Sequence, residues 1–222
     1  MTTFLLLRHA HSVANEEGIL AGRTDGIELS RIGLAQAAQL SKSLRSWKIN
    51  RFISSPLERC RSTINQTARE RRKRISSSSD FIEMDYGMWS GRKLKSLHKE
   101  KGWKKVQKQP LTFRFPQGES FEDAAKRINK GLRELAKKYP KETILIATHG
   151  DIIKLAVQIT LDADINKFQR LVVDTCSLTV IEWGEKSRSL ILFNQRIIPF
   201  KQVRKHRNSL RNRRIIGGGS GV

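Results

Sequence analysis

Apolar and polar positions along this chain alternate in blocks of two kinds. Short apolar runs at 3–8, 51–55 and 143–148 have the length and the polar flanks of buried β-strands. Between them, apolar residues recur at helical spacing over 31–47 and again over 120–138. Strands that alternate with helices favour an α/β fold with a mostly parallel sheet covered by helices on both faces.

Capping signals mark the starts of three predicted helices, the second of which follows the strand at 51–55. Ser30 precedes the first, Ser55 and Pro56 open the second, and Ser120 with Asp123 forms a variant of the capping box before the third. The apolar face of the first helix is expected from Ile32, Ala35, Leu40 and Leu44. That of the third is expected from Phe121, Ala124, Ala125, Ile128, Leu132 and Leu135.

The C-terminal quarter of the chain contains two predicted strands followed by a basic segment and a glycine-rich end. The runs CSLTVIEWG and SLILFNQ predict two neighbouring strands, antiparallel at an edge of the sheet. From about residue 201 the sequence is basic, and its last six residues are GGGSGV. We therefore expect a single domain over 1–200 and a loosely attached basic tail over 201–222.

The high positive net charge of the chain favours anionic partners. The chain has 43 Lys and Arg against 21 Asp and Glu, a formal net charge of +22, which attracts phosphorylated metabolites, nucleic acids and acidic surfaces. Two basic clusters stand out, RERRKR at 69–74 and KQVRKHRNSLRNRR at 201–214. Neither is interleaved with aromatic residues, so a solvated face and a basic tail, the latter a candidate for weak nonspecific polyanion binding, are favoured over specific nucleic-acid binding.

The remaining composition points to a cytoplasmic enzyme. Cys60 and Cys176 lie far apart and outside any metal-ligand spacing, which predicts a reducing compartment and no structural zinc. No apolar run approaches the roughly 20 residues of a membrane span, and no secretory signal is visible at the N-terminus.

Polar residues follow three of the predicted strands. Arg8 and His9 follow the first, Arg59 lies in the first turn of the helix after the second, and His149 follows the strand at 143–148. Ligands of parallel sheets bind beyond the carboxyl ends of the strands, so we expect these side chains at one site.

Two guanidiniums and two imidazoles favour an oxyanion site, above all a phosphate site. A neutral imidazole can attack phosphorus, and Glu83 is the candidate acid for the leaving group, with Asp85 as its rival. Metal binding by His9 and His149 is the competing interpretation, although no acidic triplet with ligand spacing accompanies them.

Several motifs then resemble, in order, those of the histidine phosphatase superfamily, which includes the phosphoglycerate-mutase-like enzymes. They are LLRHAHSVAN, SSPLERCRST, EMDYGMWSG, PQGES and ATHG, and the resemblance covers nearly residues 2–195. The stretch GILAGRTDGIEL is also similar to actinobacterial members labelled probable phosphomutases.

The resemblance implies a role for each motif residue. His9 would be phosphorylated, while Glu83 would give a proton to the leaving group and then take one from water. Members need no metal or other cofactor and have a single α/β domain with inserted lid elements. The residues that would hold the phosphoryl group are Arg8, Arg59 and His149, with Asn15 assisting.

Departures from the family pattern bear on the type of reaction. Ala10 and Gln117 stand where glycine is usual, and the former is tolerable if its φ is negative. Only 24 residues separate Gly91 from Pro116, which is short for a mutase lid. We therefore predict a phosphomonoester hydrolase acting on a small phosphorylated metabolite. A phosphomutase such as phosphoglycerate mutase, and a polyanion-binding protein that retains the phosphatase fold, are the alternatives.

Overall fold

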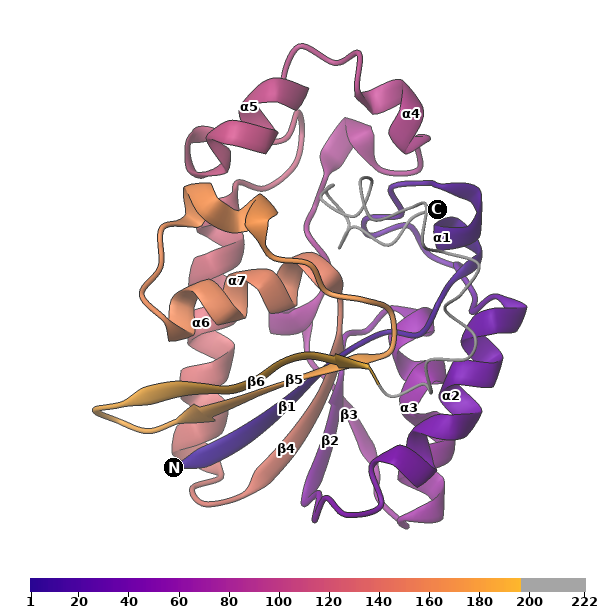
Figure 1. Cartoon of the computed structure of the whole chain (residues 1–222), viewed down its shortest axis with the longest axis vertical. Helices are drawn as coiled ribbons and strands as arrows, with labels where there is room; N and C mark the ends of the chain where they lie inside the picture. The colour runs from indigo at the N-terminus through magenta and orange to yellow at the C-terminus, as the bar shows by residue number, and fades with distance from the viewer. Residues whose placement is uncertain (197–222) are drawn as a thin grey trace.

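A computed structural model describes residues 1–196 of the chain (Figure 1). The predicted basic tail at 201–222, and the last four residues of the predicted domain, lie outside the described residues. The strands are β1 (Thr2–Arg8), β2 (Arg51–Ser54), β3 (Ile75–Ser77), β4 (Thr143–Thr148), β5 (Ser177–Trp183) and β6 (Arg188–Arg196). The α-helices are α1 (Val13–Glu17), α2 (Arg31–Ser43), α3 (Glu58–Glu70), α4 (Leu94–Leu97), α5 (Trp103–Lys108), α6 (Phe121–Lys138) and α7 (Gly150–Thr160).

The six strands form one sheet in the order β3-β2-β4-β1-β5-β6. β1 and β2 are both parallel to β4, and β3 is parallel to β2. β5 runs antiparallel to both β1 and β6, which confirms the predicted antiparallel edge. The predicted α/β class is therefore confirmed, with β1 and β4 as the central parallel pair.

Alternating side chains of β1 face two separate hydrophobic cores. Phe4 and Leu6 belong to the core beneath α6 and α7, whereas Leu5 and Leu7 belong to the core beneath α2 and α3. Figure 1 shows these two helix pairs on opposite sides of the sheet. Because β1 is buried on both faces, its sequence is a continuous apolar run up to Arg8.

Helix α2 buries only part of its predicted apolar face, since Leu40 and Leu44 are buried as predicted but Ile32 and Ala35 are exposed. Ile32 is half exposed, while Gly33 and Gln36 are buried. A Cβ on Gly33 would lie 1.9 Å from the carbonyl oxygen of His11, and Oε1 of Gln36 accepts a hydrogen bond from the His11 amide at 2.7 Å. The helix is therefore turned so that its small and polar face supports the loop after β1.

The segment between β2 and α6 also differs from its prediction. The strand expected within 80–91 is replaced by two 3-10 turns, Ser79–Phe81 and Gly87–Trp89, and the third strand of this half is β3, upstream of them. Two further 3-10 turns are Pro110–Thr112 and Ile165–Arg170.

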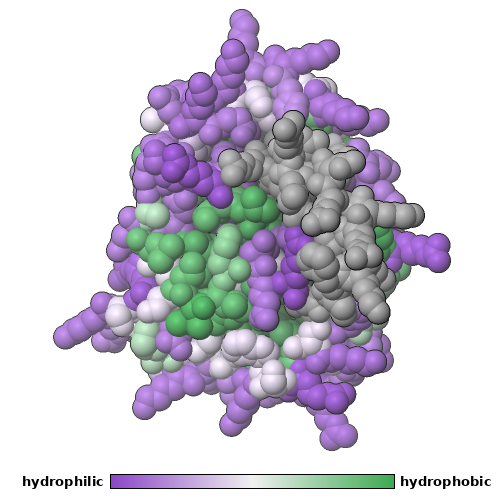
Figure 2. Space-filling model, in the orientation of Figure 1, coloured by the Kyte–Doolittle hydropathy of each residue, from purple (hydrophilic) through white to green (hydrophobic). Residues whose placement is uncertain are grey.

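Helices α4 and α5 form a cap over the carboxyl ends of the strands (Figure 1). The cap is anchored by aromatic packing, since the ring centroids of Trp89 and Trp103 are 6.1 Å apart and those of Trp89 and Phe113 are 5.6 Å apart. Its outer surface is hydrophilic (Figure 2). Among residues 1–196, no helix is long and apolar enough to cross a membrane.

Candidate active site

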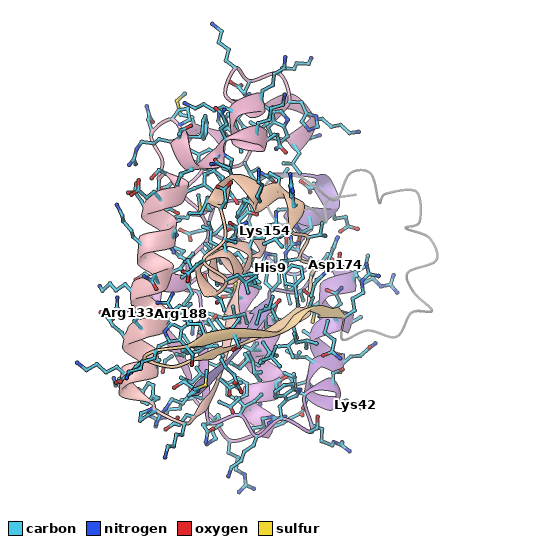
Figure 3. All side chains as sticks on the ribbon, turned by 60° about the vertical axis from the view of Figure 1, so that its left-hand side comes forward. His9, Lys42, Arg133, Lys154, Asp174 and Arg188 are labelled. Atoms are coloured by element: carbon cyan, nitrogen blue, oxygen red, sulfur yellow. The ribbon has the colours of Figure 1, made fainter. Side chains whose placement is uncertain are left out.

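The carboxyl ends of β1, β2 and β4 bring the predicted side chains together. Arg8 and His9 lie at the end of β1, His149 follows β4, and Arg59 reaches the same point from the first turn of α3. All four residues are buried, and the ring centroids of His9 and His149 are 5.3 Å apart. Figure 3 shows His9 inside the molecule, whereas Lys42 projects from its surface.

The imidazole of His9 is held in one tautomer. Its Nδ1 lies 2.8 Å from the carbonyl oxygen of Ala10, which can only accept, so Nδ1 carries the proton and Nε2 keeps its lone pair. Burial, followed by the positive charges of Arg59 and Arg8, lowers the pKa of His9 well below its usual value. The imidazole is therefore neutral near neutral pH, as a nucleophile must be.

Each of the two arginines is anchored by a backbone carbonyl, and Arg59 keeps an unsatisfied donor for an anion. Arg8 Nη1 donates to the carbonyl of Val173 at 2.6 Å, and Arg59 Nη2 donates to that of Gly22 at 2.7 Å. Arg59 Nε is buried and has no hydrogen-bond partner within the described part of the chain. A buried charged donor without an acceptor is costly, and a phosphoryl oxygen would satisfy it.

His149 is held by a residue that the sequence analysis assigned elsewhere. Arg59 Nη2 lies 3.3 Å from His149 Nδ1, and since a guanidinium only donates, Nδ1 accepts. The proton of His149 is then on Nε2, which donates to Ser55 Oγ at 2.8 Å. The prediction that Ser55 caps the following helix is wrong, because α3 begins at Glu58 with Leu57 at its N-cap.

A second neighbour of His149 is a buried thiol. Cys60 Sγ lies 3.4 Å from His149 Nε2, and burial raises the pKa of Cys60 to about 12. Both cysteines of the chain are free, and the amide of the other, Cys176, donates to the carbonyl of His9 at 3.2 Å. Burial and the nearby arginines lower the pKa of His149 well below its usual value. The ring is therefore neutral, and its 3.7 Å contact with Glu83 Oε2 is not an ion pair.

Glu83 is the carboxyl group that faces this cluster. It is 5% exposed, and its Oε1 accepts a hydrogen bond from the Met84 amide at 3.0 Å. Burial, followed by the negative charge of Asp151, raises the pKa of Glu83 to about 7. Asp85 is partly exposed, 3.4 Å from Arg23, and accepts a bond from the Gly87 amide. Of the two rival carboxylates, Glu83 alone is buried beside the histidines.

A match to a known family decides the identity of the chain. The model of the histidine phosphatase superfamily (branch 1) matches residues 4–196. The chain belongs to the histidine phosphatase superfamily. Enzymes of this superfamily are phosphatases or phosphomutases that act through a phosphohistidine without a metal. The resemblance read from the sequence motifs is confirmed, and this histidine phosphatase is an enzyme of phosphoryl transfer.

Named relatives include both kinds of enzyme. Phosphoserine phosphatase 1 of Hydrogenobacter thermophilus is 27% identical over 196 residues, covering 87% of this chain and 92% of that protein. The probable phosphoglycerate mutase GpmB of Salmonella arizonae is 27% identical over 187 residues, covering 83% and 86%.

Solved structures support the fold. Phosphoserine phosphatase from Entamoeba histolytica, in complex with 3-phosphoglyceric acid, superposes with a TM-score of 0.80 at 24% identity. The match covers 88% of this chain and 98% of that one. The predicted single α/β domain of phosphoglycerate-mutase type is therefore confirmed.

Asn15 of this histidine phosphatase lies in a helix cap. Its carboxamide oxygen accepts bonds from the amide and the hydroxyl of Ser12, at 3.0 and 2.9 Å, which completes the capping box of α1. The oxygen is therefore engaged, and the side-chain nitrogen is the group that could contact substrate.

Two positions of the phosphatase that depart from the family pattern behave differently. Ala10 is absent from the residues with positive φ, so its methyl group is tolerated as expected. Gln117 has a φ of 56°, a left-handed conformation that favours glycine.

Thr63 is a supporting residue that sequence reasoning missed. Its hydroxyl accepts a hydrogen bond from the Ala10 amide at 2.8 Å and donates to the carbonyl of Arg59 at 2.7 Å. It thus joins the loop after β1 to helix α3. Its place in SSPLERCRST, four residues after Arg59, was the signal available.

The metal interpretation finds no ligand set in the described chain. Within residues 1–196, no group of three or more His, Cys, Asp and Glu side chains is arranged to hold a metal ion. Near His9 and His149 lie cations and one carboxyl group, a donor set suited to an anion.

Proposed function

We propose that this protein is a phosphomonoester hydrolase that acts on a small phosphorylated metabolite through a phosphohistidine at His9. The observation that carries this proposal is the tautomer of His9, whose Nε2 lone pair is available beside two buried guanidiniums and a buried carboxyl group. The same residues give each step of the reaction a defined donor and acceptor.

In the first step, His9 Nε2 attacks phosphorus and the P–O bond to the leaving group breaks. Glu83, protonated in part because its pKa is about 7, gives its proton to the leaving oxygen. Arg8 and Arg59 neutralise the equatorial phosphoryl oxygens. His149 adds a third donor to the same oxygens in its other tautomer, with its proton moved from Nε2 to Nδ1. The Ser55 hydroxyl then donates to Nε2, and Arg59 Nη2 turns from Nδ1 to a phosphoryl oxygen.

In the second step, water attacks the phosphohistidine. The Glu83 carboxylate takes a proton from the water as its oxygen bonds to phosphorus. The P–N bond breaks, inorganic phosphate leaves, and His9 is neutral again. Glu83 is protonated at the end of the cycle, ready for the next ester.

The size of the cap favours hydrolysis over mutase activity. Only 24 residues lie between Gly91 and Pro116, and they form the two short helices α4 and α5. A mutase must shield the phosphohistidine from water while an intermediate turns over. The alternative, a phosphomutase, is favoured by the relative named as a probable phosphoglycerate mutase.

A labelling experiment tests the covalent step. Wild-type protein and H9A are incubated with a ³²P-labelled ester and quenched in alkali, which preserves phosphohistidine. Label on His9 in the wild type, and none in H9A, is expected. The product then separates the two reactions, since a hydrolase releases inorganic phosphate and a mutase returns an isomeric ester.

Glu83 is tested by the leaving group. E83Q should slow an alkyl phosphate by about 10²–10⁴-fold, and p-nitrophenyl phosphate far less, because a phenolate needs little protonation. D85N is the matched control, since Asp85 pairs with Arg23. Equal losses for both substrates in E83Q would assign Glu83 another role.

The remaining expectations of the sequence are part of the same proposal. We infer a catalytic domain over 1–200, a basic tail over 201–222 that binds polyanions weakly, and a cytoplasmic location. The tail carries eight basic residues, counting its histidine, within 201–214.

A further inference from the structure

Helix α7 carries two charged side chains that solvent does not reach. Asp151 and Lys154 are both 0% exposed, and Lys154 Nζ lies 3.3 Å from Asp151 Oδ1 at an i,i+3 spacing. Burying an ion pair has a desolvation cost that apolar residues of similar size would avoid. The pair lies beside the active site, because Asp151 and Lys154 follow His149, the N-cap of the same helix, by two and five residues.

The surroundings of the pair connect it to the loop of the general acid. Tyr86 Oη donates to Asp151 Oδ2 at 2.8 Å, and Tyr86 follows Glu83 by three residues. Lys154 Nζ lies 4.6 Å from the centre of the Phe168 ring and, apart from Asp151, has no polar contact among residues 1–196. Figure 3 shows Lys154 in the interior of the molecule.

Charged side chains from β1, α3 and α7 act on Glu83. Among the charged side chains, Asp151 has the largest effect on the pKa of Glu83. Its negative charge favours the protonated form of Glu83. The positive charges of Arg59, Arg8 and Lys154 have the opposite effect and favour the ionised form of Glu83. The charged groups are Arg8 from β1, Arg59 from α3, and Asp151 and Lys154 from α7, and the neutral titratable groups are His149 after β4, Cys60 from α3 and Tyr86 from the loop of Glu83 itself.

We propose that Asp151 and Lys154 are a positioning pair that balances the charge beside Glu83, so that this carboxyl group is protonated when the ester binds. Neither residue needs to contact substrate. Asp151 repels a second negative charge at Glu83, and Lys154 limits that repulsion. The inference rests on the proposed function, because it assigns the pair a purpose in the proton transfer from Glu83.

Two single substitutions test the pair. The dependence of kcat/KM on pH is measured for an alkyl phosphate, because kcat/KM reports the step in which Glu83 must be protonated. D151N removes the repulsion, so the alkaline limb should move to lower pH by about one unit. K154M removes the positive charge that offsets Asp151, while the Tyr86 bond to Asp151 remains, so the limb should move to higher pH. The pKa of Glu83, obtained by following its carboxyl ¹³C resonance against pH, should fall in D151N and rise in K154M.

Controls separate this role from folding. Asp164 and Lys167 form an exposed pair of the same i,i+3 spacing, 3.9 Å apart, and D164N and K167M should leave the limb in place. If K154M does not fold, the double variant D151N/K154M replaces it, and its displacement should be smaller than that of D151N.

Displacement of both single variants in one direction, or of neither, overturns the inference. Failure of H9A to abolish labelling would instead overturn the proposed function. The two failures are therefore distinguishable.

Discussion

The hydroxyl of Thr63 should contribute more to the free energy of unfolding than that of Thr67, which lies one turn later on the same helix. Both residues are fully buried in α3. Thr63 accepts the hydrogen bond of the Ala10 amide, whereas Thr67 Oγ1 has no hydrogen-bond partner among residues 1–196. Valine has nearly the shape of threonine, so T63V and T67V remove a hydroxyl with little change in packing.

The magnitude follows from what each change leaves behind. In T63V the amide of Ala10, a residue that is 0% exposed, loses its acceptor, which costs about 1–3 kcal/mol in free energy of unfolding. For a chain of this size, each 1 kcal/mol lowers Tm by about 2–4 °C. T67V removes a buried polar atom that has no partner, so it should be neutral or stabilising.

Urea unfolding and thermal melts of the two variants provide the assay, and turnover of p-nitrophenyl phosphate provides a second readout. T63V should also lose activity, because the carbonyl of Ala10 accepts the bond that fixes the tautomer of His9. Equal stabilities of T63V and T67V would refute the reasoning. Full activity of a destabilised T63V would refute only the link to His9.

Four further outcomes are expected. Q117G should stabilise the fold by up to about 1 kcal/mol in a urea titration, because position 117 has a positive φ; destabilisation would contradict this. Burial raises the pKa of Glu83 from 4.5 to about 7, so the free energy of unfolding of the wild type should fall as pH rises through this range. The free energy of unfolding of E83Q relative to the wild type should therefore increase with pH. A difference between the two proteins that does not change with pH would argue against the raised pKa. Deletion of 201–222 should leave kcat on a small ester unchanged and flatten the salt dependence of heparin binding; a drop in both Tm and kcat would make the segment part of the fold. Activity should survive EDTA, and a loss restored by zinc or manganese would revive the metal interpretation.

Residues placed by backbone topology could be predicted from the sequence. His9 and His149 each follow a continuous apolar run, and parallel strands deliver such residues to one edge. Helix α6 was predicted with its capping box and apolar face, because a helix of 18 residues averages out local exceptions. Its expected face is buried from Phe121 to Leu132.

Residues placed by a tertiary contact could not be predicted. Ser55 before Pro56 has the local signal of a helix cap, but an imidazole from another strand binds its hydroxyl. In α2, hydropathy favoured Ile32, yet the close approach of Gly33 to the backbone of His11 determines the face. β3 is an edge strand of three residues, two of them serine, and carries no hydrophobic period.

The two buried thiols make the closure of the active site measurable. Cys60 lies against His149, and the amide of Cys176 donates to the carbonyl of His9, so each histidine has one cysteine next to it. Both are almost inaccessible, and burial raises the pKa of each to about 12. An alkylating reagent can therefore attack them only in molecules whose site has opened. The rate of alkylation therefore measures how often the site opens. A bound phosphate analogue that contacts both histidines should lower that rate.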